Sequence, residues 1–215
     1  MARNKHPEET VDLIMDTAAT LFLTKGYDKT SLQDIIGETK LSKGAIYHHF
    51  ASKEEIFVRI CERMGAENAA VLAKVRDSKT LNGQEKLKEI FRQSLLFVNH
   101  DRILKIMPYL LDSPQFFARE FHSIFEEVAP EFIEPILRDG LADGSIRTDH
   151  PKELAEVLIL LADIWLNPML QPTTPEEVRG RCACYNDLTR PFGLELLDEE
   201  LISVLAEYAG KRQEQ

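Results

Sequence analysis

The stretch from Thr30 to Lys53, TSLQDIIGETKLSKGAIYHHFASK, constrains the fold of this chain more than any other segment. It contains two short helical patterns joined by a tight turn, and a third helix begins directly after it. Thr30, Ser42 and Ser52 each stand where a helix N-cap is expected, and Thr30 with Gln33 has the spacing of a capping box. Three helix starts so close together leave room only for compact helical packing. The sequence therefore predicts a helix-turn-helix.

The helix predicted from Lys43 onward has one apolar face, formed by Ile46 and Phe50, which we expect to be buried. The opposite face begins with Gly44 and Ala45, whose small size would let the helix approach the floor of a DNA major groove. Lys43 could reach guanine acceptors or a phosphate, and Ala45 could meet a thymine methyl group. Donors suited to phosphate oxygens follow at Tyr47, His48, His49 and Lys53. DNA binding is the prediction, and a purely structural role for these short helices is the alternative.

The distribution of charge agrees with this prediction better than the total does. The net charge of −10 is unfavourable for a nucleic-acid partner. Residues 1–63 carry nine Lys and Arg against ten Asp and Glu, whereas residues 64–215 carry seventeen against twenty-six. Residues 40–53 contain three lysines, two histidines and no acid. Most of the excess acid therefore belongs to the second part. A solvated acidic surface would explain this charge, and so would a binding site for a cationic effector.

Helical periodicity continues along the chain, and no segment alternates with the period of two that a strand requires. A first helix ends at Lys25 and Gly26, and a long helix runs from Ser52 to about Asp77. Further helices are expected near 83–99, 103–111, 114–139, 152–167, 175–189 and 198–210, with breaks at Gly and Pro. The predicted fold class is all-α. We expect a DNA-binding domain over residues 1–52 and a helical effector-binding and dimerisation domain over residues 53–215.

Several classes of protein are not indicated by the sequence. No apolar run has the length of a signal peptide or a membrane helix, so we expect a cytoplasmic protein without a membrane partner. Neither a phosphate-binding glycine loop nor an HExxH or GxSxG motif is present, so we expect no enzyme, cofactor or metal. The three cysteines cannot form a disulfide framework. Cys182 and Cys184 diverge by about 200° on a helix, which favours packing or surface roles over a metal or redox role.

The N-terminal part resembles the DNA-binding domain of the TetR family of transcriptional regulators over roughly residues 8–57. The matching residues are Ala18, Leu21, Phe22, Gly26, Tyr27, Thr30, Ile35, the run SKGAIYHHF from Ser42 to Phe50, and SKEEIF from Ser52 to Phe57. The resemblance places Lys43, Gly44, Ala45 and Tyr47 at base-reading or groove-lining positions and lets Gln33 reach a base. It places phosphate contacts at Thr30, Ser31, His48, His49 and Lys53.

The chain departs from the family in the turn before the third helix. The family usually has a small residue and then glycine there, whereas this sequence has Thr39 and Lys40. A lysine in the left-handed conformation costs about 1 kcal/mol because its Cβ approaches the following carbonyl oxygen. We therefore expect a slightly altered turn, with the recognition helix still present.

The resemblance also implies a homodimer and a small-molecule effector for the second domain. The segment 152–167 is apolar nearly all round, so its residues need cover either within the domain or at a subunit interface. By resemblance it would pair with the segment 175–189 and their symmetry mates in a four-helix bundle. The predicted dimerisation residues are Leu158, Leu161, Trp165, Cys182 and Tyr185. A two-fold dimer would hold two recognition helices about one DNA turn apart, which predicts a palindromic operator.

An aromatic-rich segment supplies the predicted effector site. The candidate ligand-binding residues are Met107, Tyr109, Phe117, Phe121, Phe125 and Trp165. Phe117, Phe121 and Phe125 follow an i, i+4 spacing, which is typical of a core at least as often as of a pocket. The predicted function is a transcriptional repressor released from double-stranded operator DNA by a small molecule. The alternative is a helical dimeric adaptor without DNA-binding activity.

Overall fold

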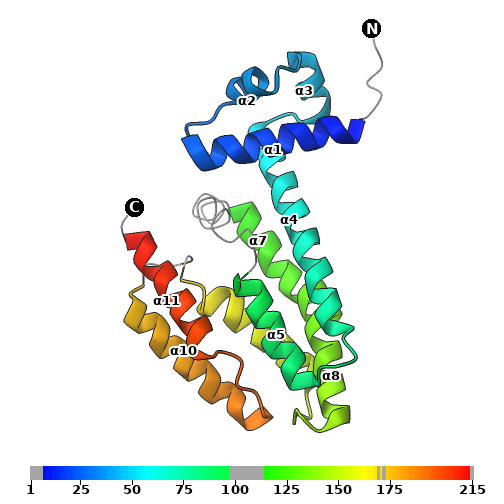
Figure 1. Ribbon diagram of the computed structural model, residues 1–215, viewed down its shortest axis with the longest axis vertical. Helices are drawn as coiled ribbons and strands as arrows, with labels where there is room; N and C mark the ends of the chain where they lie inside the picture. Colours follow the sequence, from blue (N-terminus) through cyan, green and yellow to red (C-terminus); the bar gives the residue numbers. More distant parts are fainter. Residues whose placement is uncertain (1–6, 97–113, 169, 171–172, 214–215) are drawn as a thin grey trace. The chain divides into compact units, whose positions relative to one another are not determined.

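The computed structural model describes residues 7–96, 114–168, 170 and 173–213, and over these ranges the chain forms helices and no strand (Figure 1). The predicted all-α fold class is confirmed. Contacts divide the chain into two compact units, Met1–Glu67 and Asn68–Gln215. The division falls inside helix α4 (Lys53–Arg76), so the domain boundary at residues 52 and 53 stays a prediction.

The first unit contains α1 (Pro7–Lys25), α2 (Leu32–Thr39), α3 (Lys43–His49) and the first part of α4. The end of α1 forms as predicted, because Gly26 adopts a φ of 89° and the ring of Tyr27 folds back on Phe22 with centroids 5.0 Å apart. Apolar side chains from all four helices are buried: Ile14, Ala18, Phe22, Ile35, Ile46, Phe50, Ile56, Phe57 and Ile60. This shared core fixes α2 and α3 on α1.

Ion pairs tie the helices of the first unit together. Lys25 at the end of α1 lies 2.7 Å from the Asp34 carboxylate of α2. Arg63 of α4 reaches two carboxylates of α1, Asp12 at 3.3 Å and Asp16 at 2.6 Å. Hydrogen bonds from Lys25 and then from Ser31 hold the pKa of Asp34 well below its ordinary value. Because these groups are largely exposed, the pairs fix orientation more than they add stability.

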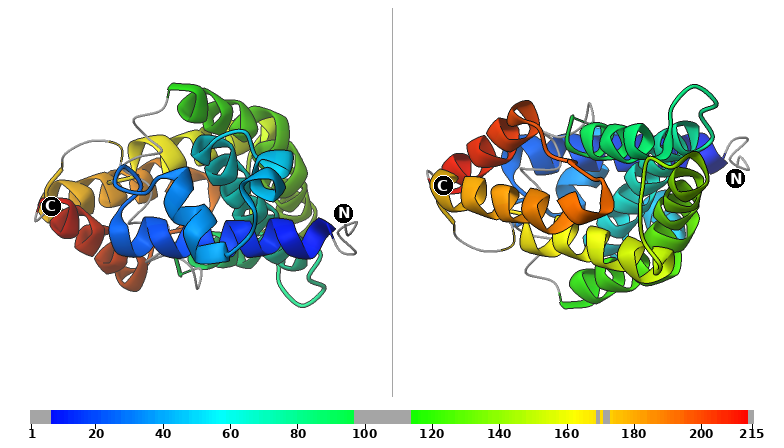
Figure 2. Two further views of the ribbon diagram at one scale, coloured as in Figure 1. Left: turned by 90° about the horizontal axis from the view of Figure 1, so that it is seen from above. Right: turned by 90° about the horizontal axis from the view of Figure 1, so that it is seen from below.

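The second unit is a helical bundle that also includes the end of α4. Its described elements are α5 (Gly83–Leu96), α7 (Pro114–Ser123), the π-helix η1 (Ile124–Ile133), α8 (Glu134–Asp143), α9 (Pro151–Leu160), the π-helix η2 (Leu161–Trp165), α10 (Pro175–Thr189), the 3-10 helix η3 (Arg190–Phe192) and α11 (Glu199–Gln213). The α7, η1 and α8 segments follow one another without a break, and α10 and α11 lie side by side (Figures 1 and 2). The helix predicted over 103–111 lies outside the described residues.

Burial inside the second unit explains much of its apolar sequence. Leu154, Ala155, Leu158 and Ile159 of α9 are covered by neighbouring helices of the same unit. Tyr185 of α10 is fully buried, and its hydroxyl donates to the Leu158 carbonyl oxygen at 3.0 Å. Burial also raises the pKa of Tyr185 well above its ordinary value. The nearly all-round apolar helix therefore finds most of its cover within the chain.

Two glycines allow α5 and α8 to cross at close range. A Cβ built on Gly83 would lie 2.3 Å from the Gly140 Cα, which is far inside van der Waals contact. A Cβ on Gly140 would in turn lie 2.4 Å from the Ile146 side chain.

In the part of the chain that the structure describes, no helix is both long enough and apolar enough to cross a membrane.

Candidate nucleic-acid interface

The start of α3 is fixed by the cap that the sequence predicts. The Ser42 Oγ accepts a hydrogen bond from the Ala45 N–H at 3.1 Å, which satisfies one of the free donors of the helix N-terminus. Ile46 is fully buried and Phe50 closes the other end of the same face at 3% exposure. The predicted buried face of this helix is confirmed. Through this face, α3 packs against the core of the first unit.

The opposite face of α3 is open. Lys43, Gly44 and His48 are exposed, Tyr47 is 45% exposed, and a Cβ on Gly44 would meet no atom within 4 Å. The Lys43 Nζ lies 5.4 Å from the centroid of the Tyr47 ring, so the cation and the phenol extend along the same side. Half-buried Ala45 and His49 flank this face, and the rings of His48 and His49 meet edge to face. The exposed start of α3 is therefore surrounded by side chains that can donate hydrogen bonds.

The start of α2 differs from the prediction. Ser31, one residue later than expected, is the N-cap, and its capping-box partner is Asp34 rather than Gln33. The Ser31 N–H and hydroxyl both donate to the Asp34 carboxylate, at 2.7 and 2.6 Å, and the Asp34 N–H donates back to the Ser31 Oγ at 3.2 Å. The assignment of Thr30 as the cap was wrong because its hydroxyl has another partner. Gln33 is thereby left exposed and available.

Thr30 lies instead in the turn between α1 and α2. It is 1% exposed, and its hydroxyl donates to the Gly26 carbonyl oxygen at 2.8 Å. A buried hydroxyl that is already bound within the chain does not reach a DNA phosphate. The predicted phosphate contact through the Thr30 side chain is therefore corrected to a structural role in the turn.

Lys53 also makes contacts that local sequence reasoning missed. Its Nζ donates to the carbonyl oxygens of Tyr27 at 2.9 Å and of Thr30 at 3.0 Å. The same nitrogen lies 4.3 Å from the centroid of the Tyr27 ring. The residues that meet here are more than twenty positions apart, so no helical or turn pattern relates them. A family resemblance that places Lys53 near the DNA gives no signal for these internal partners.

Lys40 adopts the left-handed conformation expected from its position, with φ 57° and ψ 16°. Among the described non-glycine residues it is the one with positive φ. Thr39 supports this turn, because its hydroxyl donates to the Ile35 carbonyl oxygen at 2.8 Å and accepts the Leu41 N–H at 3.4 Å. The turn between α2 and α3 is thus formed without the glycine that the family usually has there.

Replacing Lys40 by glycine should raise the free energy of unfolding by about 0.5 kcal/mol. Relief of about 1 kcal/mol of left-handed strain is partly offset by the greater flexibility of glycine in the unfolded chain. Urea unfolding followed by circular dichroism measures the difference. Lys29→Gly is the matched control, because Lys29 is an exposed loop lysine without positive φ, and it should give no gain. Equal effects of the two substitutions would contradict strain at Lys40.

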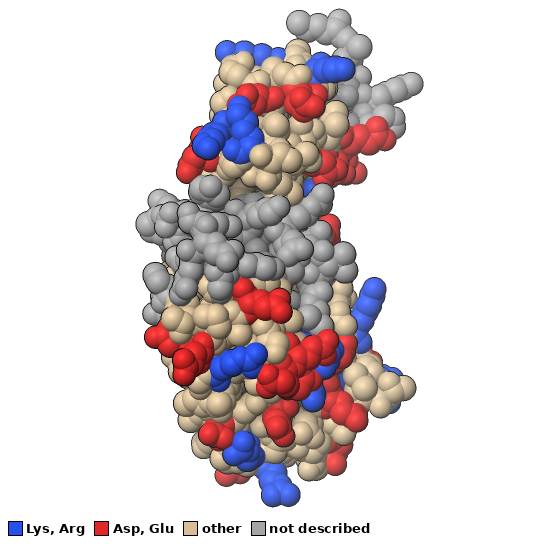
Figure 3. All heavy atoms as spheres, turned by 60° about the vertical axis from the view of Figure 1, so that its left-hand side comes forward, with Lys and Arg blue, Asp and Glu red and all other residues tan. Residues whose placement is uncertain are grey.

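Acidic side chains are spread over the visible face of the second unit (Figure 3). The predicted aromatic stripe also lies on its surface: Phe117, Phe121 and Phe125 are each more than a third exposed. Trp165 packs partly buried against the core, and Met107 and Tyr109 lie outside the described residues. Phe117, Phe121 and Phe125 are therefore not part of the described core, and their role in ligand binding stays a prediction.

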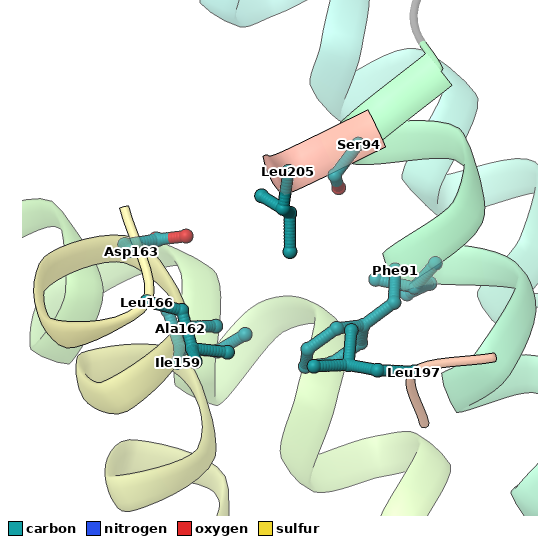
Figure 4. A pocket seen from close by; sticks show the side chains of 9 residues that line it. Phe91, Ser94, Ile159, Ala162, Asp163, Leu166, Leu197 and Leu205 are labelled. Atoms are coloured by element: carbon teal, nitrogen blue, oxygen red, sulfur yellow. The ribbon is translucent and has the colours of Figure 1, made fainter. Parts of the chain in front are cut away.

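A different set of side chains surrounds the cavity found in the second unit. It has a volume of about 70 Å³ and lies between α5, the α9–η2 segment and the C-terminal part of the chain (Figure 4). Its walls are mostly apolar, with Phe91, Ile159 and Leu205 among them. Ser94 and Asp163 contribute the polar atoms. None of the ligand-binding residues predicted within the described ranges lines this cavity, because the aromatic stripe faces outward.

The predicted dimerisation residues also need correction. Leu158, Cys182 and Tyr185 are buried within the unit, so their side chains form core contacts instead of a surface for a partner. Leu161 and Trp165 are half-buried and pack against the same core. The exposed residues of α10 include the small or apolar Gly180, Ala183, Cys184 and Leu188 at helical spacing, beside the charged Glu176, Glu177, Arg179 and Asp187. The two residues predicted for dimerisation on α10, Cys182 and Tyr185, therefore lie on its inward face.

The environments of the cysteines favour packing and surface roles. Burial raises the pKa of the Cys182 thiol to about 11, which leaves it unreactive near neutral pH. Cys61 is half-buried and Cys184 exposed, and all three are free thiols. Among the described residues, no group of three or more His, Cys, Asp or Glu side chains is placed to hold a metal ion.

Comparison with known proteins agrees with the geometry of the first unit. Residues 14–60 match the family described as bacterial regulatory proteins, tetR family. The HTH-type transcriptional repressor KstR2 of Mycolicibacterium smegmatis is 29% identical over 69% of this chain and 73% of its own length. IcaR of Staphylococcus epidermidis, a negative transcriptional regulator of the biofilm operon icaADBC, is 29% identical over 72% of this chain and 80% of its own.

The whole fold also has counterparts among solved structures. A transcriptional regulator from Cytophaga hutchinsonii superposes with a TM-score of 0.64, covering 95% of this chain and 94% of the other at 19% identity. The helical architecture and the open face of α3 are those of a helix-turn-helix protein. Residues 14–60 therefore resemble the TetR family, and the relatives that cover more of the chain are transcriptional regulators as well. The relatives are regulators and not enzymes.

Proposed function

We propose that the protein is a transcriptional repressor that binds a palindromic operator as a homodimer and releases it when a small molecule binds the second unit. The observation that carries the proposal is the open face of α3, where a Cβ built on Gly44 would point into open space and Lys43 and Tyr47 are exposed. The names of two relatives, a repressor and a negative regulator, support the direction of control. Such a repressor would act in the cytoplasm, where the DNA lies.

The candidate contacts divide into two kinds. Gly44 and Ala45 allow α3 to approach the base edges, where Lys43 reaches guanine acceptors or a phosphate. Exposed Gln33 on α2 adds a second side chain that can reach a base. The remaining exposed donors would bind phosphates on either side of the groove: Ser31, Tyr47, His48 and His49. Base contacts would give the sequence preference, and phosphate contacts would give the dependence on salt.

The exposed face of α10 is the surface we propose for dimerisation. Gly180, Ala183 and Cys184 are small, so a partner helix can approach closely, and Leu188 is 53% exposed. A two-fold dimer through this face presents two copies of α3 to successive major grooves of one operator. We expect Leu188→Arg to shift the protein toward monomers in analytical ultracentrifugation and to weaken operator binding. Leu141→Arg, at an exposed leucine of α8, is the matched control.

We propose that the effector binds in the cavity of the second unit. Its volume of about 70 Å³ is roughly half that of an engineered cavity that admits benzene, so the site enlarges or takes only part of the ligand. Release of DNA requires that the ligand favour one of two dimer geometries. Helix α4 is continuous across the division between the units, so a shift of this helix would connect the effector to the DNA-binding unit.

The decisive experiment is a titration of the protein's own upstream intergenic DNA, followed by fluorescence anisotropy at several salt concentrations. The proposal requires binding that is sequence-selective and that weakens linearly with the logarithm of salt concentration. Binding to unrelated duplex with the same affinity would contradict it. A dimer that binds no duplex at any salt concentration would instead identify the protein as a helical adaptor.

A further inference from the structure

The first turn of α4 holds the turn between α1 and α2 through one ammonium group. The Lys53 Nζ donates to two backbone carbonyl oxygens, those of Tyr27 at 2.9 Å and Thr30 at 3.0 Å. It also lies 4.3 Å from the centroid of the Tyr27 ring. An ammonium group has three N–H donors, so two carbonyls and one ring face engage it on three sides. The charge of this half-buried side chain is directed into the protein.

Two further residues of α4, Glu54 and Phe57, contact Tyr27 in the same turn. The Tyr27 ring packs against Phe57 at 4.9 Å and against Phe22 of α1 at 5.0 Å between centroids. The Tyr27 hydroxyl interacts with the Glu54 carboxylate. Burial, followed by the charge of Glu54, raises the pKa of Tyr27 to about 12, so this hydroxyl keeps its proton at neutral pH. Lys53, Glu54 and Phe57 therefore bind the backbone and the side chain of one tyrosine.

This clamp, formed by Tyr27, Thr30, Lys53, Glu54 and Phe57, lies directly before the start of α2. The Thr30 carbonyl that Lys53 binds precedes Ser31, the N-cap of α2. Without the ammonium group, two carbonyl oxygens would lose their charge-assisted partner. The position of the start of α2 would then be less well fixed. Because α2 and α3 share a core, the orientation of α3 would also be less well fixed.

We infer that Lys53 is a positioning residue for DNA recognition, which acts by fixing the turn before α2 and not by contacting a phosphate. The inference rests on the proposed DNA binding and revises the role that family resemblance gives this lysine. The two roles differ in what they predict. A phosphate contact contributes equally on every sequence, whereas a correctly set recognition helix contributes only on the operator. Because α4 continues into the second unit, the clamp is also where a shift of α4 would reach α2.

The test compares the affinities of the wild type and Lys53→Met for operator and for unrelated duplex, each over a range of salt concentrations. The positioning role predicts that the ratio of operator to unrelated affinity falls about tenfold, the equivalent of one charge-assisted hydrogen bond. The salt slope on unrelated duplex should stay unchanged. Lys29→Met is the matched control, because it removes an exposed lysine from the same turn and should leave the ratio intact.

A second variant makes the test independent of how well Lys53→Met folds. Tyr27→Leu keeps the lysine charge and removes the ring and the hydroxyl, so positioning predicts the same loss of ratio. A loss of about 0.9 from the salt slope on both duplexes, with the ratio preserved, would identify a phosphate contact and overturn the inference. An unchanged ratio in folded Lys53→Met would also overturn it. Absence of selective binding by the wild type would instead reject the proposed function.

Discussion

Gly44→Leu should abolish selective operator binding and leave the protein folded. The Cβ at this position points into open space from the exposed start of α3, so a leucine side chain would stand between the helix and the base edges. Close approach of the helix to the groove floor is required for every direct contact to a base. We expect operator affinity to fall on the order of a hundredfold or more, toward the affinity for unrelated DNA. Fluorescence anisotropy with both duplexes measures the loss.

Gly65→Leu is the control for this substitution. Gly65 lies in α4 within the first unit, is exposed, and has no atom within 4 Å of a built Cβ, as at Gly44. Both substitutions replace a helical glycine by a better helix former, so neither should lower the free energy of unfolding. Operator affinity that survived Gly44→Leu would show that α3 does not enter the groove by its N-terminal end.

Asn186→Leu should produce the largest loss of stability among the substitutions considered. The Asn186 side chain donates to the Leu197 carbonyl oxygen at 2.7 Å and accepts the Leu197 N–H at 3.1 Å. Both residues are buried, so leucine would leave a backbone donor and a backbone acceptor without partners and away from water. We expect the free energy of unfolding to fall by about 3–4 kcal/mol, measured by urea unfolding at fixed protein concentration.

The neighbouring residue provides the comparison. Asp187 is exposed on α10, and its ion pair with Arg190 at 2.8 Å joins two largely solvated side chains. Asp187→Leu should change the free energy of unfolding by less than about 1 kcal/mol. If Asn186→Leu were equally mild, the segment between α10 and α11 would not depend on its contact with the asparagine.

The sequence predicted the helices well because their signals are local. The caps at Ser42 and Gly26 and the buried pair Ile46 and Phe50 depend on residues a few positions apart, and the structure places them as expected. The cap of α2 was misplaced by one residue because Thr30 and Ser31 are both competent caps. The outcome was decided by a bond from the Thr30 hydroxyl to Gly26, which the pattern of α2 does not contain.

The wrong predictions for side chains of the second unit have a different origin. Periodicity indicates where α9 and α10 lie, but it does not say which side of each helix meets the rest of the chain. Cys182 and Tyr185 face inward, whereas Cys184 and Leu188 face outward. The cavity was missed for the same reason, because its walls come from α5, α9 and the C-terminal segment, which only the tertiary fold brings together.

Helix α4 has a consequence for dividing the protein into fragments. Ile56, Phe57 and Ile60 are buried and lie in the first unit, and the Phe57 ring packs edge-on against Phe22 at 5.8 Å. A recombinant piece that stopped at residue 52 would lack these side chains and would expose the apolar surface of α1. An autonomous DNA-binding fragment, or a chimera that exchanges sensor domains between regulators, should therefore keep α4 through Glu67.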